Sequence, residues 1–236
     1  MWPVIYDFGI IRFLGFEFHL AIYSYGFMLV VAFYTCYALL LKEMRRLGYG
    51  DKLASDILTA AAIGGIIGSK IYYLLENYDR VVIDPMGMIF SGAGLVFLGG
   101  LMGGTLGVTI VLKKNELHWL TFADIVAPLL ILGYAIGRVG CFLVGDDYGL
   151  PTRFLIGMTF ENGSPPTTYG SFTYNYPWVD LSGWDSGDLI TVYPTQIMET
   201  IIGLGIFYFL WKKRETIKVK GSLFFTYLIF AGIERF

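Results

Sequence analysis

Residues 113–138 read KKNELHWLTFADIVAPLLILGYAIGR, and this stretch decides the fold. The segment 119–137 is almost wholly apolar, and about 20 such residues are the length that crosses a bilayer as a helix. Lys113 and Lys114 precede the segment, and Arg138 follows it. An apolar run of this length between charged ends predicts a transmembrane helix. Other parts of the chain repeat the pattern.

Four more complete spans and one incomplete span are expected on the same grounds. The complete ones lie at roughly 20–41, 54–75, 90–112 and 192–211, and the sixth begins near Leu223 and is still running at Phe236. We therefore expect an all-α, polytopic membrane helix bundle with six spans in this chain. The residues 1–236 would form a single integral membrane domain, and a seventh span would lie beyond Phe236.

The composition excludes several classes of protein. Of the 236 residues, 56% are hydrophobic and 15% are charged, whereas a soluble domain carries about 25% charged residues. The net charge of −2 gives no support to nucleic-acid binding. The two cysteines, Cys36 and Cys141, match neither a disulfide framework nor a zinc-binding spacing. No metal and no cofactor are expected.

The lysines and arginines predict the orientation in the membrane. Three clusters on one side of the predicted spans hold eleven of the 17 basic residues. The clusters lie at 42–52, 113–114 and 212–220. Because short basic loops stay in the cytoplasm, the N-terminus and the long segment 139–191 are expected on the extracytoplasmic side. That segment is rich in Gly, Pro, Tyr and Asp, and we interpret it as an ordered, irregular loop.

Ionisable residues at membrane depth are candidates for function, because each costs at least ~2.5–3.5 kcal/mol there. Arg138, Glu199 and Arg235 all fall at or near the outer ends of predicted spans. Their convergence would line a polar cavity that opens outward. The alternative is that such residues pair with one another and tie helices together. For Glu199 and Asp124 both interpretations stay open.

The segment 137–149, GRVGCFLVGDDYG, follows the fourth predicted span. Gly137 and Gly140 permit close approach of the backbone to a ligand. Arg138 offers a planar guanidinium that suits a phosphate. Asp146 and Asp147 are placed to orient that arginine or to accept a proton. A second segment, YPTQIME at 193–199, opens the fifth predicted span.

Small residues at four-residue spacing predict close packing of helix backbones in lipid. Gly99 and Gly100 in the third span belong to such a row. A glycine surface also makes room for a lipid chain or head group, so these two are candidates for lipid binding. Gln196 and Glu199 in the fifth span are three residues apart and therefore share one helix face.

These residues resemble the prolipoprotein diacylglyceryl transferase family of the bacterial inner membrane. The family signature resembles Gly-Arg-x-Gly-Asn-Phe-x-Asn-Gly-Glu-x-x-Gly, which the segment 137–149 largely follows. The resemblance runs along nearly the whole chain. It includes Tyr25-Gly26, Gly99-Gly100, Asp124 with Ala127-Pro128, the Pro194-x-Gln196-x-x-Glu199 stretch, and Gly232 with Arg235.

The resemblance implies transfer of a diacylglyceryl group from phosphatidylglycerol to the lipobox cysteine of a prolipoprotein signal peptide. It implies that Arg138 and Arg235 hold the lipid phosphate, that Tyr25 contributes to the cavity, and that Asp146 stands where the family has glutamate. The expected catalytic residues are Tyr25, Arg138, Asp146, Glu199 and Arg235. The expected lipid-binding residues are Gly99, Gly100, Gly137, Arg138, Gly140, Gln196 and Arg235.

Four further positions depart from the family pattern. Leu98 replaces a histidine proposed as the base for the attacking thiol, Cys141 and Val144 replace asparagines, and Tyr193 replaces a second histidine. Two alternatives therefore stay open: a paralogue that uses the same phospholipid site with another acceptor, and a membrane protein that binds lipid without catalysis. A transporter would show inverted repeats, which the sequence lacks.

Overall fold

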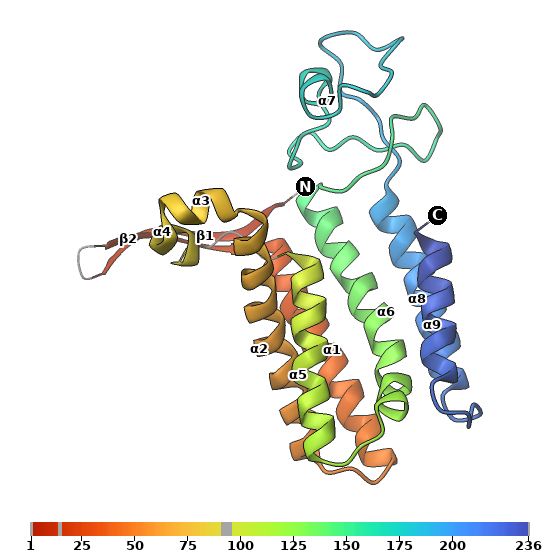
Figure 1. Ribbon diagram of the computed structural model, residues 1–236. Coiled ribbons are helices and arrows are strands. Elements are labelled where there is room, and N and C mark those ends of the chain that lie inside the picture. The colour runs from red at the N-terminus through yellow and green to blue at the C-terminus, as the bar shows by residue number, and fades with distance from the viewer. Residues whose placement is uncertain (1, 14–15, 91–95, 236) are drawn as a thin grey trace. The chain divides into compact units, whose positions relative to one another are not determined.

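The computed structural model describes residues 2–13, 16–90 and 96–235, and it is mostly helical (Figure 1). The six longer helices are α1 (Ser24–Arg46), α2 (Asp51–Glu76), α5 (Phe97–Lys114), α6 (Trp119–Val144), α8 (Thr195–Lys213) and α9 (Ser222–Glu234). The short ones are α3 (Tyr78–Ile83), α4 (Pro85–Phe90) and α7 (Tyr169–Asn175). The strands β1 (Val4–Phe13) and β2 (Phe16–Tyr23) pair as an antiparallel hairpin.

Four of these helices, α1, α2, α5 and α6, are long and apolar enough to cross a membrane, by length and composition. Large apolar side chains point outward on them, such as Val30, Ile66 and Met102, which are more than half exposed. Lipid is the solvent that such surfaces require. The helix α8 has 19 residues and α9 has 13. The mostly helical structure with four long apolar helices is consistent with the predicted membrane helix bundle, and the number of six spans stays a prediction.

The hairpin departs from the expected all-α class. Its first strand, VIYDFGIIRF, has apolar residues at both odd and even positions, so it lacks the alternation that marks a half-buried strand. Gly9 has a positive φ of 76°, and its N–H donates to Asp7 Oδ1 at 2.8 Å beside a register shift. The predicted first span began at residue 20, but β2 extends to Tyr23 and α1 starts at Ser24.

Contacts divide the chain into two compact units. The first unit contains Met1–Cys36, Ala127–Lys218 and Phe225–Phe236, and the second contains Tyr37–Val126 and Val219–Phe224. In the second unit α2 and α5 pack backbone to backbone. A Cβ added at Gly103 would overlap the carbonyl oxygen of Gly64, and one at Gly99 would overlap Tyr72 Cβ. The predicted close packing of small residues is confirmed at these positions.

Asp124 has a structural partner in the second unit. Its carboxylate accepts the backbone N–H of Gly221 at 2.6 Å and that of Phe224 at 2.9 Å. These N–H groups lie at the start of α9, where helix donors are unpaired and the helix dipole favours a negative charge. Of the two interpretations left open for Asp124, the structure supports the tie between helices.

In the first unit, α6 continues to Val144, so the irregular segment begins at Gly145 and not at residue 139. That segment lies beyond the end of α6 and the start of α8 (Figure 1). It has its own small core, formed by the buried Phe160, Phe172, Ile190 and Val192. The irregular segment is thus ordered, with α7 inside it.

Candidate functional site

The candidate site of the first unit lies where α6 ends, α8 begins and α9 ends. Tyr134 and Arg138 are four residues apart on α6, so they project from the same face. Glu199 lies in the second turn of α8, and Glu234 is the last residue of α9. Because α8 and α9 run in opposite directions, the end of one helix meets the start of the other (Figure 1).

Arg138 is the centre of the site, and its guanidinium contacts partners on two edges. Nε lies 2.5 Å from Glu199 Oε2. Nη1 donates to Asp147 Oδ2 at 3.1 Å, and Nη2 donates to the Asp147 carbonyl oxygen at 3.2 Å. The side chain of Arg138 is 11% exposed and that of Glu199 is 20% exposed, whereas that of Asp147 is 70% exposed. The Glu199 edge is therefore shielded, and the Asp147 edge is open to solvent.

The turn after α6 is held by the start of α8. Gln196 is fully buried, and its Nε2 donates to the Asp146 carbonyl at 2.6 Å. The Thr195 hydroxyl donates to the Asp147 carbonyl at 2.9 Å. The Gly149 N–H donates to the Tyr193 carbonyl at 2.9 Å. The two segments noted in the sequence, 137–149 and 193–199, therefore form one structure.

Asp147 has a positive φ of 52°, in the left-handed region that costs a non-glycine residue about 1–2 kcal/mol. Gly145, two residues earlier, has a φ of 76°. This backbone aims the Asp147 carboxylate at Arg138. The three hydrogen bonds to the carbonyls of Asp146 and Asp147 keep the strained turn in place.

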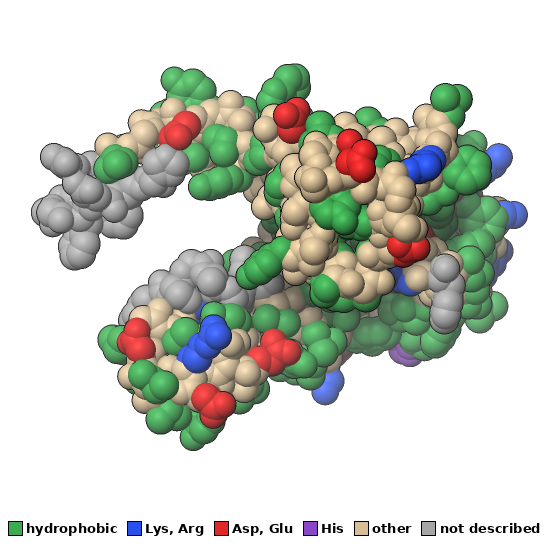
Figure 2. Space-filling model, turned by 90° about the horizontal axis from the view of Figure 1, so that it is seen from above, with side chains coloured by type: hydrophobic (Ala, Val, Ile, Leu, Met, Phe, Trp, Pro, Cys, Tyr) green, Lys and Arg blue, Asp and Glu red, His purple; other side chains and the backbone are tan. Residues whose placement is uncertain are grey.

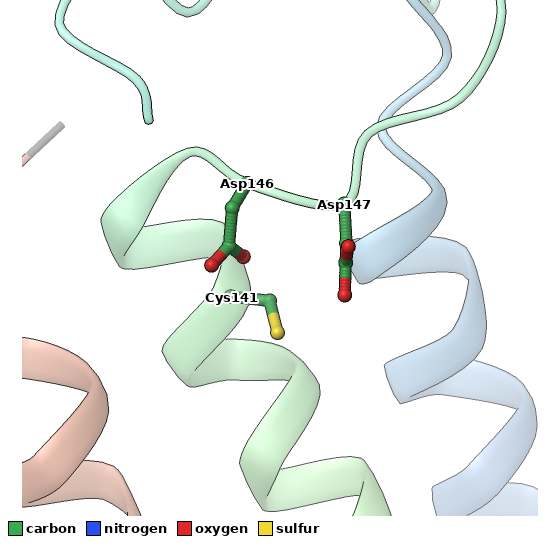
Figure 3. Close-up of side chains that lie close together, drawn as sticks. All are labelled: Cys141, Asp146 and Asp147. Carbon is green, nitrogen blue, oxygen red and sulfur yellow. The ribbon is translucent and has the colours of Figure 1, made fainter. Parts of the chain in front are cut away.

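Figure 3 shows Cys141, Asp146 and Asp147 close together, and their potential ligand atoms lie within 4.8 Å of one another. Burial raises the pKa of the Asp146 carboxyl, and the neighbouring charge of Asp147 adds to the shift, while the hydrogen bond with the Cys141 thiol lowers it. The Asp147 carboxylate is already paired with Arg138. A guanidinium beside a ligand oxygen opposes a metal cation, so the cluster fits a carboxyl–thiol pair better than a metal site.

Tyr134 joins two carboxyl groups. Its hydroxyl oxygen lies 2.5 Å from Glu199 Oε2 and 2.9 Å from Glu234 Oε1. The helices α6, α8 and α9 each supply one member of this group. Glu199 therefore contacts both Arg138 and Tyr134.

The structure brings Tyr25 and Gly140 together. A Cβ at Gly140 would lie 3.1 Å from Tyr25 Cδ2 and 3.2 Å from Met28 Cβ, so α1 covers this face of α6. A Cβ at Gly137 would meet nothing within 4 Å. Gly140 thus acts as a packing position for Tyr25, and the space beside Gly137 is open in the described part of the chain.

The remaining predicted residues are Arg235, which belongs to the first unit, and Gly99 and Gly100, which belong to the second. Arg235 is exposed in the turn after α9, and it has no hydrogen bond or ion pair with another residue in the described ranges. It directly follows Glu234, whose carboxyl group contacts the Tyr134 hydroxyl. Gly99 and Gly100 belong to the second unit and face Tyr72 and Ser69 of α2. Lipid contacts of these three residues stay predictions.

Neither Tyr134 nor Glu234 is among the site residues predicted from the sequence. The four-residue spacing from Tyr134 to Arg138 was the available signal, since it places both side chains on one helix face. The contact between Tyr134 and Glu234 joins residues 100 positions apart, which no local pattern reveals.

Comparisons with known proteins identify the family of this chain. The family model "Prolipoprotein diacylglyceryl transferase" matches residues 13–236. A phosphatidylglycerol–prolipoprotein diacylglyceryl transferase of Clostridium tetani is 31% identical over 92% of this chain and 80% of its own length. A second, of Clostridium perfringens, is 34% identical over 94% of this chain and 80% of its own length. The chain therefore belongs to the prolipoprotein diacylglyceryl transferase family.

Proposed function

We propose that this protein transfers a diacylglyceryl group from phosphatidylglycerol to the thiol of a lipobox cysteine in a prolipoprotein signal peptide. The observation that carries the proposal is the buried Arg138, whose guanidinium has one shielded edge on Glu199 and one open edge on Asp147. A planar guanidinium binds a phosphate through two parallel N–H groups. The relatives named above act on these same two substrates by name.

The lipid phosphate would take the place of the Asp147 carboxylate. Asp147 is 70% exposed, so its ion pair is screened by solvent and contributes about 0–1 kcal/mol. Its left-handed backbone stores a similar or larger cost that release would relieve. Glu199 would stay on Nε and keep the guanidinium plane oriented. Asp147 is in this view a stand-in for the phosphate.

Charge attraction at this site would be local. On the face shown in Figure 2, carboxylates are scattered singly among hydrophobic and other side chains, without one broad basic patch among the atoms described there. An anionic head group would therefore be held by individual arginines. We assign the role of a second phosphate-binding arginine to Arg235, which directly follows Glu234. Gly137, beside open space, and Tyr25 would line the path of the lipid.

In the reaction the sulfur of the acceptor thiolate bonds to the glycerol carbon of the diacylglyceryl group. The bond from that carbon to the phosphate oxygen breaks, and glycerol phosphate leaves with the electron pair. Arginines stabilise the charge that develops on the leaving group. The thiol must first lose its proton, since the thiolate is the nucleophile. Asp146 is the proposed acceptor, because burial raises the pKa of its carboxyl and makes it a stronger base.

We further propose six membrane spans, with α8 and α9 as the fifth and sixth, in the inner membrane of a bacterium. Basic residues in the last turns of α1, α5 and α8 support a cytoplasmic location for these helix ends; they are Arg45, Arg46, Lys113, Lys114, Lys212 and Lys213. The N-terminus and the segment after Gly145 would then face outward. Phosphatidylglycerol would reach Arg138 from the outer leaflet.

The test incubates purified protein with phosphatidylglycerol and a lipobox peptide. A gain of one diacylglyceryl mass on the peptide cysteine is the expected result. Turnover of phosphatidylglycerol without peptide modification would point to another acceptor, and stoichiometric binding without turnover would point to a lipid-binding protein. The same assay on Leu98→His would show whether the histidine that this chain lacks limits the rate.

A further inference from the structure

Three apolar side chains protrude together from the irregular segment after α6. Phe154, Leu155 and Ile156 are 72%, 103% and 55% exposed. They form a tight turn, because the Gly157 N–H donates to the Phe154 carbonyl at 2.8 Å. A fully exposed leucine packs against almost nothing in its own chain, so this turn is convex. We name residues 154–156 the apolar tip. Contiguous exposed apolar side chains are typical of a surface that binds a partner or a membrane.

The base of the apolar tip is fixed to the stretch of chain that leads into α8. On one side, the Thr152 N–H donates to the Thr191 carbonyl at 2.8 Å, and the Thr191 hydroxyl donates to the Thr152 carbonyl at 2.5 Å. On the other side, Met158 and Val192 exchange two backbone hydrogen bonds at 3.0 and 2.9 Å. An ordered backbone therefore presents the three apolar side chains.

The apolar tip lies beside the start of α8. The ring centroids of Phe154 and Tyr193 are 6.4 Å apart, and Tyr193 stands two residues before Thr195, the first residue of α8. In the proposed orientation the basic end of α8 is cytoplasmic, so its start lies at the outer membrane interface. Aromatic and large aliphatic side chains are favourable at that depth. By contrast, α7 lies well beyond the ends of α6 and α8 (Figure 1).

We propose that the apolar tip inserts into the outer leaflet and binds the lipid surface next to α8. Fluid acyl chains surround a protruding side chain without a preformed pocket, whereas a peptide is held in a groove or along a sheet edge. A convex tip of Phe, Leu and Ile therefore fits lipid better than a peptide.

This inference rests on the membrane orientation given with the proposed function, and it adds a contact that positions the site. The Gly149 N–H donates to the Tyr193 carbonyl, and Tyr193 lies against Phe154 of the apolar tip. Insertion of the tip therefore holds the Asp146–Asp147 turn, which covers Arg138, at the membrane surface.

Spin labels on the full chain in liposomes of phosphatidylglycerol and phosphatidylcholine measure the depth of the apolar tip. Leu155→Cys carries the label, and Tyr174→Cys on α7 is the matched control; the native side chains are 103% and 86% exposed, so neither change disturbs packing. The wild type, with Cys36 and Cys141, gives the background. The label at 155 should collide several-fold more with oxygen, which concentrates in lipid, than with a water-soluble nickel complex. The label at 174 should show the reverse, and equal access of the nickel complex to both would overturn the proposal.

A charge in the apolar tip gives a second readout. A carboxylate is costly in lipid, so Phe154→Asp should expose the label at 155 to the nickel complex, whereas Phe154→Leu should leave it in lipid. An added lipobox peptide tests the other partner. A label at 155 that is open to water in liposomes and becomes protected only with the peptide would overturn insertion.

The transfer assay separates this proposal from the proposed function. A protein with an inserted tip and no diacylglyceryl transfer would count against the proposed function alone. A protein that transfers the group while the label at 155 stays in water would overturn insertion alone.

Discussion

Replacing Arg138 with lysine separates the geometry of the guanidinium from its charge. Arginine contacts Glu199 through Nε and Asp147 through both Nη groups, whereas a lysine ammonium is a single point charge. A lysine can stay near Glu199, but it cannot hold Glu199 on one edge and present two N–H groups to a phosphate on another. The substitution should therefore damage catalysis more than stability.

The two effects differ in size. The Asp147 contact is 70% exposed and contributes about 0–1 kcal/mol to stability. The Glu199 contact is a shielded ion pair, and breaking a buried ion pair costs about 3–5 kcal/mol, part of which lysine retains. We expect a loss of about 2 kcal/mol in the free energy of unfolding. Loss of one aligned donor to the leaving phosphate should lower kcat/KM about 100- to 1,000-fold.

The assay compares initial rates of peptide modification with the denaturant midpoint of unfolding in detergent. Arg45→Lys is the matched control. Arg45 forms a bidentate pair with Asp51 at 2.7 and 2.6 Å, but the two side chains are 63% and 55% exposed. The control should change stability by no more than about 1 kcal/mol and leave turnover intact. The reasoning fails if Arg138→Lys keeps kcat/KM within about threefold of the wild type, because Arg138 would then only tie helices together.

Four further substitutions test the surroundings of Arg138. Burial raises the pKa of Asp146 above its value in the unfolded chain, so the wild type should lose stability relative to Asp146→Asn as the pH rises through that pKa. Thermal unfolding of both proteins from about pH 4 to pH 8 measures the difference in stability. A difference that does not change with pH would refute the prediction. Gln196→Leu removes the donor to the Asp146 carbonyl and should lower stability by about 1–3 kcal/mol, as seen in the unfolding midpoint; an unchanged midpoint would show that water replaces the amide. Gly140→Ala places a methyl group against Tyr25 and Met28 and should cost about 1–3 kcal/mol, while Gly137→Ala enters open space and should be neutral or stabilising. A Gly137→Ala protein that is stable yet binds phosphatidylglycerol poorly would support lipid contact at that residue.

The sequence was sufficient to predict the long apolar helices and to single out Arg138 and Glu199, which the structure brings into contact. Apolar runs between charged ends predict spans wherever the run is long, as in α2 and α6, because lipid requires a helix there. The rows of glycines correctly predicted the close packing of α2 on α5. Arg138, Asp146 and Glu199 stood out because charge near a membrane is costly and is kept for a reason.

The sequence was insufficient where contacts are non-local. The hairpin at the N-terminus lacks an alternating pattern, and Arg138 stands within a helix that continues to Val144, past the end expected for the span.

Only the tertiary structure decided that Asp147 covers Arg138, that Asp124 caps α9, and that Tyr134 joins Glu199 to Glu234. The physical reason is one of range. Hydropathy and spacing report how each segment meets its solvent, which is a local property. Hydrogen-bond partners depend on which ends of distant helices lie side by side. Because α8 and α9 are antiparallel, the end of α9 lies beside the start of α8.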